Sequence, residues 1–229
     1  MFNYPEGPYG KRILSLVSEG DSVLDLGCGI GAASIMLSPF CKRVIAMDQD
    51  KNALAFLEAN ARKLKLNNIE TIHDVWPVSA PVNTDIVIAL HVKKAMYSFT
   101  NLKLVFESAK RGGFIACQAP ISVQDEPFRE LKEALGITPR SENCENGCYI
   151  MGILNGMGAS VSCEKKVYEF GQPLDTAEDA VSFIAWQVDA DDSMIQTVGQ
   201  YMKRYTDKTG YGKYLVQIKR HCCGITFLK

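Results

Sequence analysis

Short apolar runs alternate with amphipathic stretches along the first half of the chain. Buried strands are predicted for five apolar runs, at residues 22–26, 43–47, 68–73, 85–90 and 114–117. Apolar residues at helical spacing predict helices between these runs, over 30–37, from the N-cap Asp50 to Leu64, and from Leu102 to the turn at 111–113. Strands that alternate with helices form a parallel sheet with helices on both faces, so the pattern predicts an α/β fold.

The last third of the chain departs from this alternation. A strand is predicted over 161–170. A helix follows it and begins at Thr176, with Asp179 three residues later, an arrangement close to a capping box. A long final strand is predicted over 213–229, and Gly224 within it is a candidate β-bulge.

Composition limits the class of protein. The chain has 229 residues, of which 47% are hydrophobic and 22% charged, as in an ordinary globular protein. Lys and Arg total 25 against 26 for Asp and Glu, and this balance disfavours a non-specific nucleic-acid binder, which usually carries a basic excess. Since no linker divides the chain, we expect a single domain over 1–229 with insertions at 120–143 and 171–212.

Membrane and secretion signals are not seen in the pattern. The longest apolar stretch, around Ile86 to Leu90, is far shorter than the roughly 20 residues that a membrane span needs. The first residues have no apolar core of the signal-peptide kind. We therefore expect a soluble cytoplasmic protein with no membrane partner.

Eight cysteines raise the question of disulfides or a metal. Without a secretory signal, reduced thiols are favoured. Cys144 and Cys148 would share a face of a helix, whereas Cys222 and Cys223 would point to opposite faces of a strand. Soft thiolates suit zinc or arsenic, but paired C-x-x-C spacing is missing, so we expect buried free thiols and no metal.

A glycine-rich segment, Asp25-Leu26-Gly27-Cys28-Gly29-Ile30-Gly31, joins the first predicted strand to the first predicted helix. Glycine permits a tight turn and lets a ligand approach the backbone, and the helix beyond offers unpaired N–H groups. A dinucleotide-binding loop would place its third glycine one residue later, at Ala32. Asp25 would repel a pyrophosphate and would suit a ligand that carries an ammonium group.

This segment, DLGCGIG, resembles the first motif of the class I, Rossmann-like S-adenosylmethionine-dependent methyltransferases, and the resemblance extends over about residues 4–120. It implies a doubly wound, mostly parallel seven-stranded sheet with helices on both faces and an antiparallel C-terminal strand. It also implies S-adenosylmethionine as the cofactor. The glycine-loop contacts with that cofactor would come from Asp25, Gly27, Cys28, Gly29 and Gly31.

The resemblance implies further cofactor contacts at the ends of the next strands. Asp48 would accept hydrogen bonds from both ribose hydroxyls, as acids do in dinucleotide folds, although an ordinary N-cap role is the alternative. Gln49 would pack near the adenine, Asp74 would accept a hydrogen bond from the adenine amine, and Val75 would offer its backbone. Trp76 either stacks on the adenine or is buried under its loop.

Two segments of the resemblance lie near the transferred methyl group. TDIVIALHV is similar to the fourth motif of small-molecule methyltransferases, in which Leu90 and His91 reach the site. Tyr4 and Tyr9 lie in an N-terminal segment that similar enzymes fold over the cofactor. RGGFIAC resembles the motif before the fifth strand, and the N-P-P-Y variant is absent.

The sulfonium methyl group is already electrophilic, so transfer is an in-line displacement that needs positioning and often a base. His91 is the best candidate base because histidine titrates near neutral pH, and a structural histidine is the alternative. Tyr97 either orients the substrate or packs in the core.

We expect methyl transfer to a small-molecule acceptor, with the insertions shaping the acceptor pocket and helices at 176–205 able to form a homodimer surface. A methyltransferase acting on RNA or protein is a second hypothesis, supported only by a few basic residues such as Lys213, Lys219 and Arg220. A third is a catalytically silent regulatory protein that binds the cofactor, because a fold alone does not establish chemistry. The glycine spacing disfavours a nicotinamide dehydrogenase.

Overall fold

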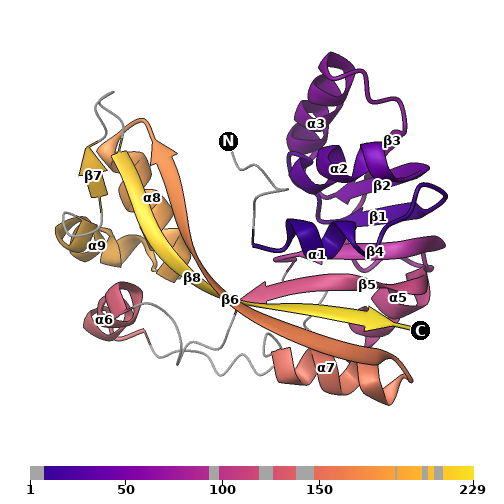
Figure 1. Cartoon of the computed structure of the whole chain (residues 1–229). Coiled ribbons are helices and arrows are strands. Elements are labelled where there is room, and N and C mark those ends of the chain that lie inside the picture. The colour runs from indigo at the N-terminus through magenta and orange to yellow at the C-terminus, as the bar shows by residue number, and fades with distance from the viewer. Residues whose placement is uncertain are drawn as a thin grey trace. The chain divides into compact units, whose positions relative to one another are not determined.

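The computed structural model describes residues 8–92, 98–118, 126–137, 147–188, 190–202, 206–208 and 214–229. The chain divides into two compact units. Unit 1 comprises Met1–Gln118, Asn143–Lys166 and Cys222–Lys229, and unit 2 comprises Ala119–Glu142 and Val167–His221. The expected insertions fall almost entirely within unit 2. Two long strands, β6 (Ser160–Leu174) and β8 (Tyr214–Leu228), each have residues in both units (Figure 1).

Unit 1 is built on a parallel sheet. Its parallel strands are β1 (Ser22–Leu26), β2 (Arg43–Asp48), β3 (Ile69–His73), β4 (Thr84–Leu90) and β5 (Ala109–Gln118). The strand order is β3-β2-β1-β4-β5-β8-β6; β8 pairs with β5 in the antiparallel sense, and the short β7 (Thr206–Lys208) pairs with β8. The expected mostly parallel sheet with an antiparallel C-terminal strand is confirmed.

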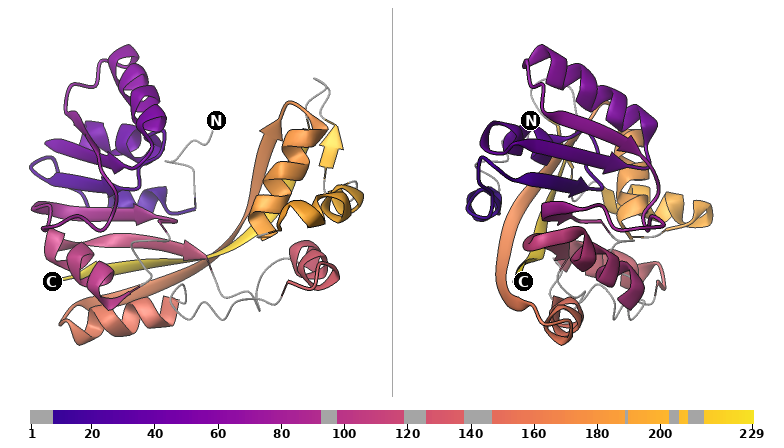
Figure 2. Two further views of the ribbon diagram at one scale, coloured as in Figure 1. Left: turned by 180° about the vertical axis from the view of Figure 1, so that it is seen from behind. Right: turned by 90° about the vertical axis from the view of Figure 1, so that its right-hand side faces the viewer.

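Helices connect the parallel strands (Figure 2). The connecting helices are α2 (Ala32–Leu37), α3 (Lys51–Lys63) and α5 (Phe99–Ser108). The chain moves outward from β1 to β3, then returns past β1 to β4 and β5. Right-handed crossovers therefore place α2 and α3 on one face of the sheet and α5 on the other. The direction changes between β1 and β4, and open α/β sheets bind ligands at such a point, outside the carboxyl ends of the strands.

The remaining helices lie before, after and outside these crossovers. They are α1 (Gly10–Leu14), the 3-10 turn Ser38–Phe40, α6 (Glu126–Ala134), α7 (Gly147–Gly156), α8 (Ala177–Val188), the 3-10 turn Asp192–Met194, and α9 (Ile195–Met202). None of these helices in the described chain is long and apolar enough to cross a membrane.

Helix α3 forms where the sequence predicts it, and Asp50 is its N-cap. The Asp50 carboxylate accepts hydrogen bonds from the backbone N–H groups of Asn52 (2.8 Å) and Ala53 (3.3 Å), which would otherwise lack partners. Leu54 and Leu57 are buried against the sheet. The helix therefore starts immediately after the loop that follows β2.

The boundary between α5 and β5 differs from the expectation. The helix was expected to continue to 111–113, but it ends at Ser108, and Ala109 is already extended. The Ser108 hydroxyl accepts the N–H of Val82 (3.0 Å), and the Ser108 carbonyl accepts the Thr84 hydroxyl (3.2 Å). These bonds with the start of β4 end the helix and begin the strand before the glycines are reached.

The expected bulge at Gly224 is not found in the pairing of β5 with β8. Partners run without a shift from Gly112↔Leu228 to Gln118↔Cys222. A Cβ atom on Gly224 would lie 2.4 Å from Cε1 of Tyr9, so glycine is needed here to make room for an aromatic ring.

Unit 2 has a small core of its own. Its buried side chains come from α6, α8 and α9, namely Leu131, Ala180, Ile184, Ala185, Val188 and Val198. The predicted capping box opens α8: the N–H of Asp179 donates to the Thr176 hydroxyl (3.0 Å), and the N–H of Thr176 donates to the Asp179 carboxylate (3.2 Å).

Candidate functional site

The loop between β1 and α2 is held in a conformation that favours glycine. Gly27, Gly29 and Gly31 have φ angles of 66°, 54° and 84°. A Cβ atom on Gly27 would lie 2.5 Å from Val92, and one on Gly31 would lie 2.1 Å from Leu57. A Cβ atom on Gly29 would meet nothing within 4 Å. The outer two glycines thus allow close packing, and the central one borders open space.

The end of β2 and the turn after it, residues 47–50, here called the β2 turn, organise this loop. The Met47 carbonyl accepts the N–H groups of Gly27 (2.8 Å) and Cys28 (3.0 Å). The Asp48 carboxylate accepts the N–H of Gly29 through Oδ2 (2.7 Å) and that of Asp50 through Oδ1 (2.9 Å). An ionised carboxylate has about four acceptor positions, so two remain on Asp48 for a ligand.

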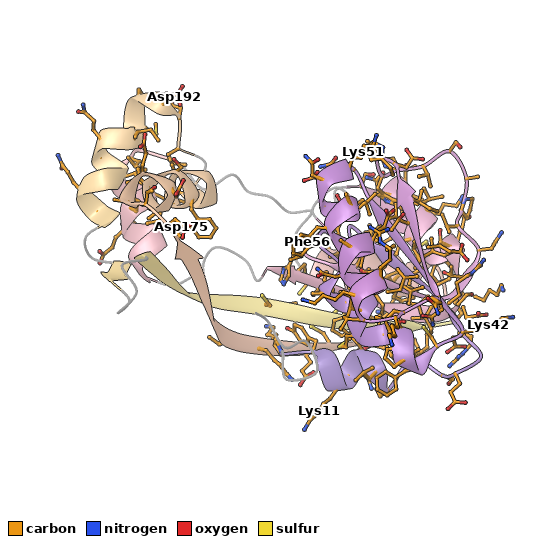
Figure 3. All side chains as sticks on the ribbon, turned by 90° about the horizontal axis from the view of Figure 1, so that it is seen from above. Lys11, Lys42, Lys51, Phe56, Asp175 and Asp192 are labelled. Atoms are coloured by element: carbon orange, nitrogen blue, oxygen red, sulfur yellow. The ribbon has the colours of Figure 1, made fainter. Side chains whose placement is uncertain are left out.

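The end of β3 joins the same turn. The N–H of Asp74 donates to the Asp48 carbonyl (3.2 Å), and the imidazole Nε2–H of His73 donates to the Gln49 carbonyl (3.1 Å). In Figure 3, Lys51 marks the start of α3, directly after the β2 turn. Three parallel strands therefore deliver the loop residues to one place at the carboxyl edge of the sheet.

Asp25 lies beneath the glycine loop and is 2% exposed. Burial raises the pKa of Asp25 to about 6; hydrogen bonds from the hydroxyl and backbone N–H of Ser34 oppose the rise, and the charge of Asp48 adds to it. The Ser34 hydroxyl donates to the carboxylate at 2.5 Å. Asp25 is therefore an enclosed acid that loses its proton close to neutral pH.

Cys28 is partly buried between these acids. Burial, together with the charges of Asp25 and Asp48, raises the pKa of the Cys28 thiol well above its usual range. The thiol contacts the Gly29 carbonyl at 3.6 Å. Cys28 thus adds no negative charge to the loop at neutral pH and is a poor nucleophile there.

The loop after β3 contains the expected adenine contacts. Asp74 and Val75 are exposed, and the N–H of Val75 donates to the Asp74 carboxylate at 2.7 Å. The backbone donor that Val75 was expected to offer to adenine is therefore engaged by its neighbour. Trp76 is 5% exposed, and its indole N–H has no hydrogen-bond partner among the described residues. Its burial supports the reading of a tryptophan packed under the loop.

His91 follows the end of β4 in a strained conformation. Its φ of 58° lies in the left-handed region, which is sparsely populated by residues other than glycine and often marks a functional position. Its N–H donates to the Ala116 carbonyl of β5 (2.8 Å). His91 and its neighbour Leu90 are half-buried at the same carboxyl edge as the glycine loop.

Three tyrosines were expected near the site, and the structure describes one of them, Tyr9. Tyr4 and Tyr97 lie outside the described residues. Tyr9 is 4% exposed, and its ring lies 5.2 Å from that of Phe114 and next to Gly224. These contacts give Tyr9 a packing role in unit 1, and its cofactor-lid role stays a prediction.

The cysteines of the described chain form no disulfide. Cys41, Cys117, Cys222 and Cys223 are buried as expected, and two others, Cys148 and Cys163, are exposed. Cys144 lies outside the described residues, so its place on the same helix face as Cys148 stays a prediction. Within the described part of the chain, no group of His, Cys, Asp and Glu side chains is arranged to hold a metal ion.

Several features of the site depend on residues that the sequence did not single out. Ser34 lies on the first turn of α2 and holds Asp25. His73 is the last residue of β3 and reaches the β2 turn. Neither belongs to a motif, because each role arises only when separate strands and helices meet.

These residues fit S-adenosylmethionine better than a dinucleotide. Asp48 has acceptor positions for a ribose diol, and the open space beside Gly29 lets a ligand reach the backbone. Asp25 and Asp48 place two acids around the loop, which suits an ammonium group and repels a pyrophosphate.

Comparison with known families gives the same assignment. A family model described as the TRM5/TYW2 methyltransferase domain matches residues 1–137, which is more than half of the chain. The chain belongs to the TRM5/TYW2 methyltransferase domain family. The expected class I, Rossmann-like, S-adenosylmethionine-dependent methyltransferase class is confirmed.

Two curated relatives of this methyltransferase-family protein each match part of the chain. The probable S-adenosyl-L-methionine-dependent methyltransferase TehB of Haemophilus influenzae is 30% identical over 112 residues, covering 46% of this chain and 38% of that protein. The mouse (Mus musculus) tRNA (uracil-5-)-methyltransferase homolog A is 25% identical over 154 residues, covering 55% and 24%. The chain thus spans well under half of the length of these two relatives.

Solved structures show the same fold. The YcgJ protein of Bacillus subtilis superposes with a TM-score of 0.62 at 13% sequence identity, and the match covers 96% of this chain and 97% of that one. This similarity shows that the two proteins share a fold.

Proposed function

We propose that this protein transfers the methyl group of S-adenosylmethionine to a small-molecule acceptor. The observation that carries the cofactor part of the proposal is the β2 turn, where Asp48 is fixed by the N–H groups of Gly29 and Asp50. A carboxylate held in this way needs little reorganisation to accept two ribose hydroxyls.

The acceptor part rests on charge. Unit 2, the segments 119–142 and 167–221, has 13 acidic and 9 basic residues. Figure 3 labels two of these acids, Asp175 and Asp192. An acidic unit disfavours the phosphate contacts that dominate affinity for nucleic acids. We propose that unit 2 carries the residues that select the acceptor.

The bound cofactor would supply an electrophilic methyl group. Asp48 would hold the ribose, Asp74 would accept from the adenine amine, and ionised Asp25 would favour the ammonium end. His91 would take a proton from the acceptor as it attacks, since base catalysis typically contributes 10²–10⁴-fold. The loop residues would chiefly fix position, which an in-line displacement requires.

A second candidate acceptor is RNA. The family model and the mouse relative that is named a tRNA methyltransferase favour it. The two candidates differ in their affinity for RNA. An RNA acceptor has to be bound by basic side chains that contact its phosphates, whereas a small-molecule acceptor needs no such contacts.

Two measurements test the proposal. Titration calorimetry should show binding of S-adenosylmethionine and S-adenosylhomocysteine, and none of NAD. Methyl-labelled S-adenosylmethionine is then incubated with the protein and with small-molecule, RNA or protein fractions of a cell extract. Transfer of label to the small-molecule fraction alone would support the proposal. Transfer of label to RNA would show that RNA is the acceptor instead. Binding of the cofactor without any transfer would indicate a catalytically silent cofactor-binding protein.

A further inference from the structure

Residues 47–49 of the β2 turn accept the six hydrogen bonds described above. Five come from backbone N–H groups: those of Gly27, Cys28, Gly29, Asp50 and Asp74. The sixth comes from the side chain of His73. A side-chain substitution leaves the backbone donors in place. Of these six bonds, mutagenesis can therefore directly remove that of His73.

The position of His73 makes this bond local and accessible. β3 is the outer strand next to β2, and His73 is the direct partner of Asp48 in the register of the two strands. The imidazole is exposed and reaches the first residue after β2, where it bonds to the carbonyl of Gln49 at 3.1 Å. Since a carbonyl can only accept, Nε2 carries the proton.

We propose that His73 is a positioning residue of the cofactor site, whose Nε2–H holds the Gln49 carbonyl and thereby fixes the adjacent Asp48 carboxylate toward the ribose. The inference rests on the proposed function, because it assumes that S-adenosylmethionine binds at the β2 turn. His73 itself is not assigned a contact with the reacting atoms.

The end of β3 holds the two peptide groups on either side of Gln49. The Asp48 carbonyl is held by the Asp74 N–H and the Gln49 carbonyl by His73, so both ends of the Gln49 residue are tied to the end of β3. Without the imidazole, the Gln49 carbonyl loses its bond to the end of β3, and the turn samples more conformations. Those conformations must be lost again when the ribose binds, which weakens affinity without removing any direct contact.

The expected effect is modest. A single intramolecular hydrogen bond contributes about 0.5–1.5 kcal/mol, so a His73→Ala variant should bind S-adenosylhomocysteine about two- to tenfold more weakly. His73→Gln places an amide N–H at a similar reach and should restore most of the affinity. Glu70→Ala is the matched control, because Glu70 is also exposed on β3 but pairs with Arg43, away from the turn.

The test is calorimetry of S-adenosylhomocysteine and of adenosine with the full-length protein and these three variants, alongside thermal melts. We expect both ligands to lose affinity by the same factor in His73→Ala, because adenosine retains the ribose. The melting temperature should fall by at most a few degrees, because one hydrogen bond of the folded protein is lost. Equal binding by wild type and His73→Ala would overturn the inference, as would a failure of His73→Gln to restore affinity. A wild-type protein that binds no S-adenosylhomocysteine would instead overturn the proposed function.

Discussion

The burial of Asp25 determines the pH at which its side chain becomes charged. It is almost fully buried, and the Ser34 hydroxyl donates to it, yet burial still raises its pKa to about 6. In the free protein, Asp25 therefore gains a proton as the pH falls from 7 to 5. An ammonium group on the cofactor would meet a charged partner above this range and a neutral one below it.

The pH dependence of cofactor binding follows from this pKa. An α-amino group with an ordinary pKa of about 7.7–8.0 stays protonated between pH 5 and 7, so the charge that changes in the pair is that of Asp25. We expect S-adenosylhomocysteine to bind about tenfold more weakly at pH 5 than at pH 7. Calorimetry at both values checks this, and Asp25→Asn should flatten the profile. A wild-type profile as flat as that of the variant would contradict the ammonium role.

The same shift affects stability with the opposite trend. The folded-state pKa of Asp25 lies above its unfolded value of 3.8, so the folded protein keeps the proton longer. Its contribution to the free energy of unfolding is fully present below about pH 4 and is lost as the pH rises to about 6.

Asp48 is predicted to dominate ribose recognition. Replacing Asp48 with Asn removes the charge and one acceptor oxygen, and hydrogen bonds to charged groups contribute about 1.5–3 kcal/mol, so affinity for S-adenosylhomocysteine should fall at least about tenfold. Asp50→Asn is the control, because Asn is also a good N-cap for α3. Unchanged calorimetric affinity in Asp48→Asn would remove Asp48 from the ribose site.

His91 can be tested without disturbing its backbone. Its left-handed conformation is tolerated by Asn, so His91→Asn should fold normally. If His91 is the base, kcat for the acceptor should fall by about 10²–10⁴, while S-adenosylhomocysteine affinity stays the same. A variant with full activity would leave His91 with a structural role at the end of β4.

The motif residues could be predicted from the sequence, but their supports could not. The glycine spacing and Asp50 are local signals, and their conformations agree with the structure. The contacts of Ser34 with Asp25 and of His73 with Gln49 join residues 9 and 24 positions apart. The first contact depends on how α2 packs on β1, and the second depends on the pairing of β2 with β3. Apolar spacing alone specifies neither.

At the level of elements, β4 and α3 were predicted well for physical reasons. A continuous apolar run such as residues 86–89 marks a strand covered on both sides, and all four of these side chains are buried. The end of α5 was predicted wrongly because Ser108 bonds with the start of β4. The bulge expected at Gly224 is not found against β5, and this glycine instead makes room for Tyr9, near the other end of the chain.

Two glycines should therefore respond in opposite ways to alanine. In Gly224→Ala the new methyl group would meet the Tyr9 ring, and overpacking of this kind costs about 1–3 kcal/mol. In Gly152→Ala, within α7, nothing lies within 4 Å, so helix propensity should stabilise the protein by about 0.5–1 kcal/mol. Denaturant unfolding measures both. A neutral Gly224→Ala would show that the ring can move aside.

At the scale of the whole molecule, charge separates the two candidate acceptors. Unit 1 has 16 basic and 13 acidic residues, whereas unit 2 has 9 basic and 13 acidic residues. Non-specific nucleic-acid binders reach dissociation constants of about 10⁻⁴–10⁻⁶ M at physiological salt. We expect no gel shift of tRNA at about 100 μM protein and physiological salt, a concentration at which even the weakest of these binders would be half bound. A shift that weakens steeply as salt is added would favour the RNA acceptor.

The division of β6 and β8 between the units has a consequence for engineering. The chain passes between the units four times, after Gln118, Glu142, Lys166 and His221, and the last two crossings lie inside hydrogen-bonded strands. Unit 2 is therefore not a cassette that can be cut out at a linker. A chimera that exchanges it with a relative needs four splice points, two of which must preserve strand register, and a library of single-crossover recombinants would consist mainly of misfolded chains.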